Sequence, residues 1–184
     1  MMDEFSLVTT PIKDLLIIKQ KRYVDDRGYL EVTYNSKIML NLLGVEFVQD
    51  KVTKSARGVL RGIHYQDNFP QGKLIKVLKG KVLDVVIDLR TSSKTFGQHF
   101  KIELSGDKLE MLYLPPGVGH GLLVIEDETL FLYKTTEYYY SNYDRGIIWN
   151  DSGLNINWDL NKYQINSPIL SERDKSLPQF NGEL

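Results

Sequence analysis

The feature that most constrains the fold of this chain is a succession of short segments rich in valine, isoleucine, leucine and tyrosine, each bounded by turn residues. Such segments, separated by glycine, proline, asparagine or aspartate, are typical of β-strands. Repeated along most of a chain, they favour an all-β sandwich or barrel. We expect strands within residues 15–20, 47–53, 73–80, 81–89, 99–106, 110–117, 121–128 and 129–140.

Helical signal is scarce outside residues 36–44. This segment follows a possible N-terminal cap at Asn35 or Ser36 and stops at Gly44, which predicts one short helix. Its apolar residues at helical spacing are Ile38, Leu42 and Val45. From Asn150 onward, polar residues and prolines predict an irregular C-terminal segment wrapped over the barrel.

Composition narrows the class of protein. The chain has 184 residues, of which 42% are hydrophobic and 26% charged, and no linker divides it, so we expect residues 1–184 to form one domain. The absence of cysteine excludes disulfides and favours the reducing cytosol. Neither a signal peptide nor a membrane-spanning run, which needs ~20 apolar residues, is expected. A formal net charge of −1 gives no support to non-specific nucleic-acid binding, although a small anionic ligand remains compatible.

An arginine and a histidine interrupt the apolar sequence of residues 58–66, where unpaired charge would be costly in a buried strand. Arg61, His64 and Lys73 lie within thirteen residues, so a hairpin could gather them in one cavity. In a regular strand Arg61 and His64 would point to opposite faces. A bulge at Gly62 would re-aim one of them. Taken alone, the segment is equally consistent with a surface arginine and a core histidine.

Two further segments carry candidate functional groups. His120 stands between two glycines after a Pro-Pro-Gly turn, where it is either a turn histidine half in solvent or part of a site. Tyr133 is either a core residue or a phenol in the barrel mouth that can act as a general acid. Because side chains alternate along a strand, Tyr133 shares one face of its strand with Phe131 and Thr135.

The two histidine segments are similar to the paired motifs of cupin barrels, in which a His-x-His, a Glu and a later His hold a metal. Here Gln66 replaces the second imidazole, and Lys73 stands where a carboxylate would help. A divalent ion needs three or four nitrogen or oxygen ligands. The third histidine, His99, lies in an alternating strand and is expected to be exposed. We therefore expect no metal.

Eight segments of the chain carry a resemblance to a known family: 25–30, 47–50, 58–66, 71–90, 115–121, 132–139, 145–151 and 167–178. They resemble segments of the dTDP-4-dehydrorhamnose 3,5-epimerases, and the resemblance extends over nearly the whole length of the chain. It implies a cupin-type jelly-roll β-barrel with a few short helices, a homodimer, no metal or organic cofactor, and a dTDP-linked nucleotide-sugar substrate.

The implied reaction inverts C3 and C5 of dTDP-4-dehydro-6-deoxy-D-glucose, the two carbons that flank its C4 ketone. Such a reaction needs a base near neutrality, a donor at the developing enolate oxygen and an acid across the ring. By resemblance His64 is the base, Lys73 the oxyanion partner and Tyr133 the acid. Asp174 would accept a hydrogen bond from the other ring nitrogen of His64 and fix its tautomer.

The resemblance also implies the residues that bind the substrate. Tyr139 would stack on the thymine, and Arg27 would reach the nucleotide from the neighbouring subunit. Further polar contacts fall at Asp144 and Arg173, although the acid is not expected to touch a diphosphate directly. The residues implied at the sugar and diphosphate are Gln49, Arg61 and His120.

Two positions depart from the family pattern. Five residues after Arg27 the family usually has a glutamate, whereas this chain has Val32, with Glu31 one position earlier. Lys51 stands where an asparagine is usual. Two alternatives stay open: a related enzyme that inverts C3 or C5 alone, and a cupin sugar-binding module without turnover.

Overall fold

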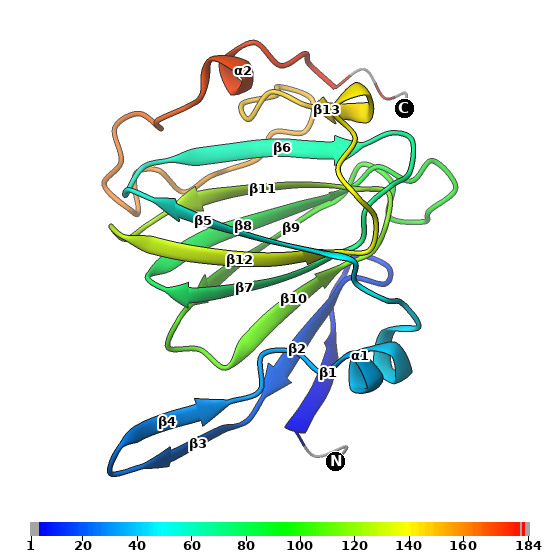
Figure 1. Ribbon diagram of the computed structural model, residues 1–184. Helices are drawn as coiled ribbons and strands as arrows, with labels where there is room; N and C mark the ends of the chain where they lie inside the picture. Colours follow the sequence, from blue (N-terminus) through cyan, green and yellow to red (C-terminus); the bar gives the residue numbers. More distant parts are fainter. Residues whose placement is uncertain (1–3, 181, 183–184) are drawn as a thin grey trace.

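The architecture consists of two antiparallel β-sheets that enclose a common core (Figure 1). The computed structural model describes residues 4–180 and 182. The first sheet contains, in spatial order, β1 (Phe5–Thr9), β2 (Leu16–Gln20), β10 (Glu110–Leu114), β7 (Lys73–Lys79), β12 (Thr129–Thr135) and β5 (Gln49–Ser55). The second contains β13 (Asp144–Gly146), β6 (Leu60–Gln66), β11 (Val118–Val124), β8 (Lys81–Asp88) and β9 (His99–Ser105). The expected all-β jelly-roll barrel is confirmed.

Each of the eight segments predicted to be extended overlaps a strand, although β11 begins three residues before the predicted start at residue 121, and residues 58–66 contain β6. The strands that the pattern missed are β1, β13 and the pair β3 (Arg22–Asp25) and β4 (Gly28–Glu31). They are short or largely exposed, so they carry little of the alternation by which a half-buried strand is recognised.

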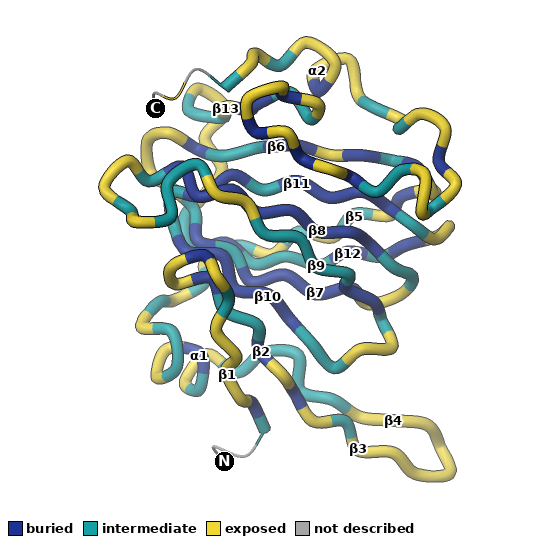
Figure 2. Tube along the Cα trace, turned by 180° about the vertical axis from the view of Figure 1, so that it is seen from behind, coloured by how far each residue is buried: buried dark blue, intermediate teal, exposed yellow. Residues whose placement is uncertain are grey.

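The core has an inner layer and two outer layers. The inner cluster lies between the sheets and draws on both, with Ile75 and Phe131 from the first and Val86 and Leu122 from the second. One outer cluster covers the first sheet, and the other covers the second sheet. Both faces of each sheet are therefore buried over much of their length (Figure 2).

Helix α1 (Ser36–Leu43) forms where the sequence predicted it. The side chain of Asn35 caps it by accepting a hydrogen bond from the backbone N–H of Ile38 at 3.1 Å. Gly44 ends it in the left-handed conformation, with φ of 71°. The buried side chain of Met39 belongs to the outer cluster that covers the first sheet.

The C-terminal segment runs across the second sheet, as predicted (Figure 1). Trp158 and Ile165 of this segment pack with Leu60 of β6, and the indole N–H of Trp158 donates to the carbonyl of Trp149 at 2.7 Å. Its regular elements in the described residues after β13 reduce to helix α2 (Glu172–Lys175); the one-turn 3₁₀ helix η2 (Ser141–Tyr143) precedes β13. The segment brings α2 beside β6.

The β3–β4 hairpin extends away from the barrel (Figures 1 and 2). Val24 is 75% exposed and Leu30 64% exposed, and the tyrosines at positions 23 and 29 are also half-exposed or more. Among the described residues, no helix is long and apolar enough to cross a membrane.

Candidate active site

A cavity of about 330 Å³ opens between the two sheets. Most residues that the sequence analysis assigned to a site line its wall: His64, Tyr133, Lys73, Asp174, Arg61, His120, Tyr139, Asp144 and Arg173. They come from strands of both sheets, from the connection after β12 and from α2. Segments more than a hundred residues apart in sequence therefore meet at one place.

A bulge in β6 allows Arg61 and His64 to face the same cavity. His64 pairs with His120 of β11 and Arg61 pairs with Leu122, so β6 holds one more residue than β11 over this interval. Gly62 lies between them with φ of 97°, and a Cβ there would sit 2.5 Å from the carbonyl oxygen of His120. The predicted re-aiming at Gly62 is confirmed, and only glycine fits without a shift of backbone.

His64 is held by a carboxylate from α2. Its Nε2 lies 2.6 Å from Oδ1 of Asp174, and the Ser171 hydroxyl donates to Oδ2 at 2.8 Å. Burial alone would raise the pKa of Asp174, but the hydrogen bonds from His64 and Ser171 bring it below its ordinary value. The ionised Asp174 orients the imidazole and leaves Nδ1 as the nitrogen available to a substrate.

Lys73 and Tyr133 stand on the opposite wall, on the adjacent strands β7 and β12 of the first sheet. Burial lowers the pKa of Lys73 to about 8, against the charges of Asp84 and Asp144, which raise it. Burial raises the pKa of Tyr133, so the phenol keeps its proton at neutral pH. The His64 imidazole thus lies across the cavity from the Tyr133 phenol and the Lys73 amine.

A second histidine–aspartate pair lies deeper in the site. Nε2 of His120 is 2.8 Å from Oδ2 of Asp84, a β8 residue without solvent exposure. The ring of His120 stacks on Phe131, with 6.1 Å between ring centroids. The sequence analysis missed Asp84, although one acid inside the apolar run of β8 was a signal that a buried partner must exist.

The mouth of the cavity combines aromatic and cationic groups. Asp144 accepts a hydrogen bond from the hydroxyl of Tyr139 at 2.9 Å and forms an ion pair with Arg173 at 2.9 Å. The ammonium of Lys51 lies 4.5 Å from the ring centroid of Tyr139. Arg61 donates to the hydroxyl of Ser55 at 3.2 Å. Asp144 therefore holds both Arg173 and Tyr139, and Lys51 adds a cation beside the ring of Tyr139.

Two assigned residues do not line the cavity. Gln49 lies at the start of β5, and its buried side-chain amide oxygen has no hydrogen-bond partner in the described residues. Arg27 lies in the turn of the β3–β4 hairpin, where it is highly exposed and paired with Asp25. The roles of Gln49 and Arg27 in substrate binding stay predictions. The role of Arg27 requires a second subunit.

The structure also shows where Glu31 and Val32 lie, the two positions at which the sequence departs from the expected family pattern. The carboxylate of Glu31 pairs with Arg22 and Lys76, each at 2.9 Å, at the base of the hairpin. Val32 packs into the outer cluster of the first sheet. Neither side chain lines the cavity.

Several lining residues were missed by sequence reasoning. Ser171 carries a local signal, because a serine three residues before Asp174 is a typical helix cap, and its side chain accepts from the backbone N–H of Asp174. The others become visible only through strand pairing, which sets Thr53 beside Phe131 and Lys51 beside Tyr133. The remaining missed residues are Tyr65, Gln66, Gln71 and Leu122.

The side chains of the site are poorly arranged to ligate a metal ion. In the described part of the chain, no three histidine, aspartate or glutamate side chains are grouped to share one ion. The two cavity histidines are each bonded to their own aspartate, and His99 is exposed on β9 as expected. The absence of a metal from the reaction stays a prediction.

A family model described as dTDP-4-dehydrorhamnose 3,5-epimerase matches residues 9–182. The chain belongs to this family. The dTDP-4-dehydrorhamnose 3,5-epimerase of Methanothermobacter thermautotrophicus is 41% identical over 176 residues, which span 95% of this chain and 94% of that one.

Solved structures of epimerases agree with this assignment. A dTDP-6-deoxy-D-glucose-3,5-epimerase of Legionella pneumophila, in complex with dTDP-4-keto-L-rhamnose, superposes with a TM-score of 0.87 at 36% identity, covering 97% of this chain and all of its own. A 3′-monoepimerase of Streptomyces bikiniensis, in complex with dTDP-quinovose, gives a TM-score of 0.85 at 27% identity, covering 92% and 85% of the two chains.

Proposed function

We propose that the protein is a cofactor-independent epimerase that converts dTDP-4-dehydro-6-deoxy-D-glucose to dTDP-4-dehydro-L-rhamnose. The observation that carries this proposal is the arrangement of acid–base groups across the cavity. The His64–Asp174 pair lies on one wall, and Tyr133 with Lys73 lies on the other. Membership of the epimerase family supports the same reaction.

The reaction follows from the acidity of carbons next to a ketone. Nδ1 of His64 removes the proton from C3 or C5, and the electrons move to the C4 oxygen to give an enolate. The ammonium of Lys73 stabilises this oxygen more than the neutral ketone, an effect typically worth 10²- to 10³-fold in rate for one donor. Tyr133 then protonates the carbon from the opposite face, which inverts it. Solvent returns the proton to the phenolate and removes one from His64.

The mouth of the cavity suits a nucleoside diphosphate. Arg61, Lys51 and Arg173 supply positive charge for the diphosphate, and the exposed ring of Tyr139 offers a flat face to the base. The substrate would then place its sugar between His64 and Tyr133. The ligand in the Legionella pneumophila structure is a nucleotide sugar of this kind.

Epimerisation at a single carbon is the second candidate, because of the similarity to the Streptomyces bikiniensis 3′-monoepimerase. Both reactions use a base, an enolate partner and an acid. They differ in whether the ring can turn to present its second carbon to His64. Product analysis separates them.

Replacement of the base tests the proposal. We expect His64→Ala to lower turnover of the 4-keto nucleotide sugar by about 10³-fold or more, because proton abstraction at both carbons uses this imidazole. The product is followed by proton NMR. The matched control is His99→Ala, which removes an exposed histidine outside the cavity and should keep the wild-type rate.

Undiminished turnover in His64→Ala would refute the assigned base. A wild-type protein that binds the nucleotide sugar and leaves it unchanged would identify a sugar-binding module instead.

A further inference from the structure

Asp84 is a charged residue in the most buried strand of the barrel. Every residue of β8 after Lys81 is buried, and Asp84 has no solvent exposure. Its neighbours at alternate positions, Val82 and Val86, belong to the cluster between the two sheets. A buried carboxylate destabilises the fold unless its charge is paired or hydrogen-bonded.

The partners of Asp84 belong to the active site. Oδ2 holds Nε2 of His120 at 2.8 Å, whereas Oδ1 is buried and has no hydrogen-bond partner among the described residues. The imidazole of His120 is also stacked on Phe131, so both its plane and its tautomer are restrained. With Nε2 bound to the carboxylate, Nδ1 is the ring nitrogen that remains for a ligand.

The charge of Asp84 also acts on Lys73 from across the core. Burial disfavours the ammonium form of Lys73, and Asp84 is the strongest of the charges that oppose this effect. Asp144 acts in the same direction and Lys51 in the opposite one. The other titratable or charged residues that line the cavity are Arg61, His64, Tyr65, His120, Tyr133, Tyr139, Arg173 and Asp174.

We propose that Asp84 is a positioning residue of this reaction, which orients His120 toward the sugar and supplies the counter-charge for Lys73. The inference rests on the proposed epimerase function and extends it to a residue outside the cavity wall. Asp84 acts through two other side chains and does not touch the substrate. It resembles Asp174 in holding a histidine, but it serves the group that stabilises the enolate.

The variant Asp84→Asn keeps the shape of the side chain and removes its charge. Wild-type kcat should fall above about pH 8, as Lys73 loses its proton. In Asp84→Asn the pKa of Lys73 drops further, so this alkaline limb should move to lower pH by about one unit. We also expect kcat at the optimum to fall about 10- to 100-fold with a smaller change in KM, because the groups proposed for the nucleotide, Arg61, Arg173 and Tyr139, are unaltered.

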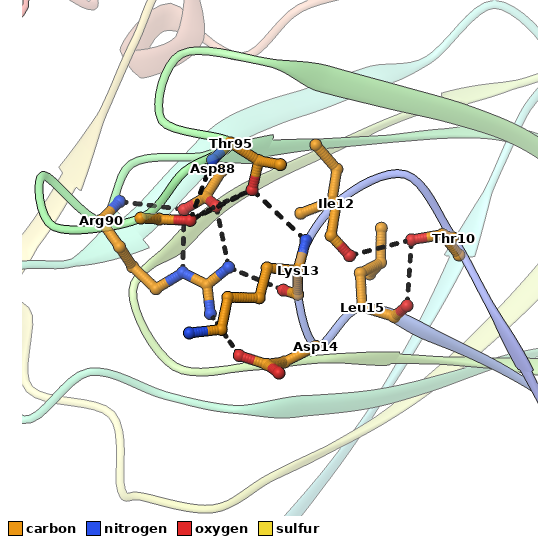
Figure 3. A network of polar contacts seen from close by, with 9 residues as sticks. Thr10, Ile12, Lys13, Asp14, Leu15, Asp88, Arg90 and Thr95 are labelled. Atoms are coloured by element: carbon orange, nitrogen blue, oxygen red, sulfur yellow. Dashed lines mark hydrogen bonds and ion pairs between the residues drawn. The ribbon is translucent and has the colours of Figure 1, made fainter.

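Asp88→Asn is the matched control at the other end of β8. Asp88 is equally buried, but it accepts hydrogen bonds from Arg90, Ser93 and Thr95, in a network that ties the strand to residues 10–15 (Figure 3). Its replacement should lower the melting temperature and leave the shape of the pH profile unchanged. A shift of the alkaline limb in Asp84→Asn but not in Asp88→Asn supports the positioning role.

An unshifted profile in folded Asp84→Asn, or equal losses in both variants without a shift, would overturn the inference. If Asp84→Asn does not fold, ¹⁵N NMR of His120 in the wild-type protein decides. The proton is expected on Nε2, and a proton on Nδ1 alone would contradict the inference. A wild-type enzyme without turnover would refute the proposed function, whereas an active wild type with an unaltered Asp84→Asn refutes this inference alone.

Discussion

At the scale of single residues, the site separates two tasks that an epimerase must perform on the same carbon. His64 and Tyr133 come from different sheets, so one can remove a proton and the other can return it on the opposite face. Asp174 of α2 holds the imidazole of His64, and the hydroxyl of Ser171, the N-cap of α2, donates to the other oxygen of Asp174. Burial keeps the phenol of Tyr133 protonated. In the proposed reaction, inversion at the carbon would therefore depend on the placement of these two side chains on different sheets.

The variant Tyr133→Phe isolates proton return. We expect it to reduce net inversion by about 10²-fold or more while exchange of the C3 proton with solvent persists, because His64 still forms the enolate. Exchange and inversion are measured in the same NMR sample. Equal loss of both would show that the phenol does more than donate a proton.

The residues found from sequence are those with a local signal or a family motif. His64, Lys73, Tyr133 and Asp174 belong to the family resemblance, and the cavity contains all four. Asp84 and Lys51 were not assigned to the site, because their place in it depends on strand pairing. Register is a property of the folded sheets, and no short stretch of sequence specifies it alone.

At the scale of elements, local rules predicted what local physics controls. The cap at Asn35 and the stop at Gly44 delimit α1 because both act through neighbouring backbone groups. The three-residue strand β13 exists because it pairs with β6, and β1 has a single buried residue. Such elements take their conformation from tertiary contacts, so the sequence pattern did not predict them.

The bulge in β6 is the element-level feature on which the site depends most. We expect Gly62→Ala to destabilise the fold by about 2 kcal/mol or more, because alanine disfavours this positive φ and its Cβ would meet backbone. Activity should fall as well, since His64 follows the bulge. Thermal unfolding and turnover provide the two measurements.

Gly44→Ala serves as the control, because it has a positive φ with nothing within 4 Å of the added Cβ. It should lose some stability and keep its activity. If Gly62→Ala were as stable and as active as Gly44→Ala, the close approach at the bulge would not be required.

At the scale of the whole molecule, the β3–β4 hairpin is the element that projects from the barrel and leaves its apolar side chains unpacked. Its apolar side chains are exposed, and the Glu31, Arg22 and Lys76 ion pairs hold its base. We propose that it packs on a second copy of the chain, which would bring Arg27 toward that copy. Assembly and the cytosolic location stay predictions.

Light scattering tests the assembly. The wild-type protein should have about twice the chain mass of 21.3 kDa. The double variant Val24→Lys, Leu30→Lys should have about half the mass of the wild type, because two buried charges would oppose the contact. Ile169→Lys, an exposed apolar position in the C-terminal segment, is the control that should stay dimeric. A monomeric wild type would contradict the proposed homodimer.

The central claim is that one base removes a proton next to the ketone at both C3 and C5. The most direct test incubates the wild-type protein with dTDP-4-dehydro-6-deoxy-D-glucose in D₂O and locates deuterium by NMR. The proposed function predicts label at both carbons. Label at one carbon would identify a monoepimerase, and label at neither would contradict the account of the site as an epimerase.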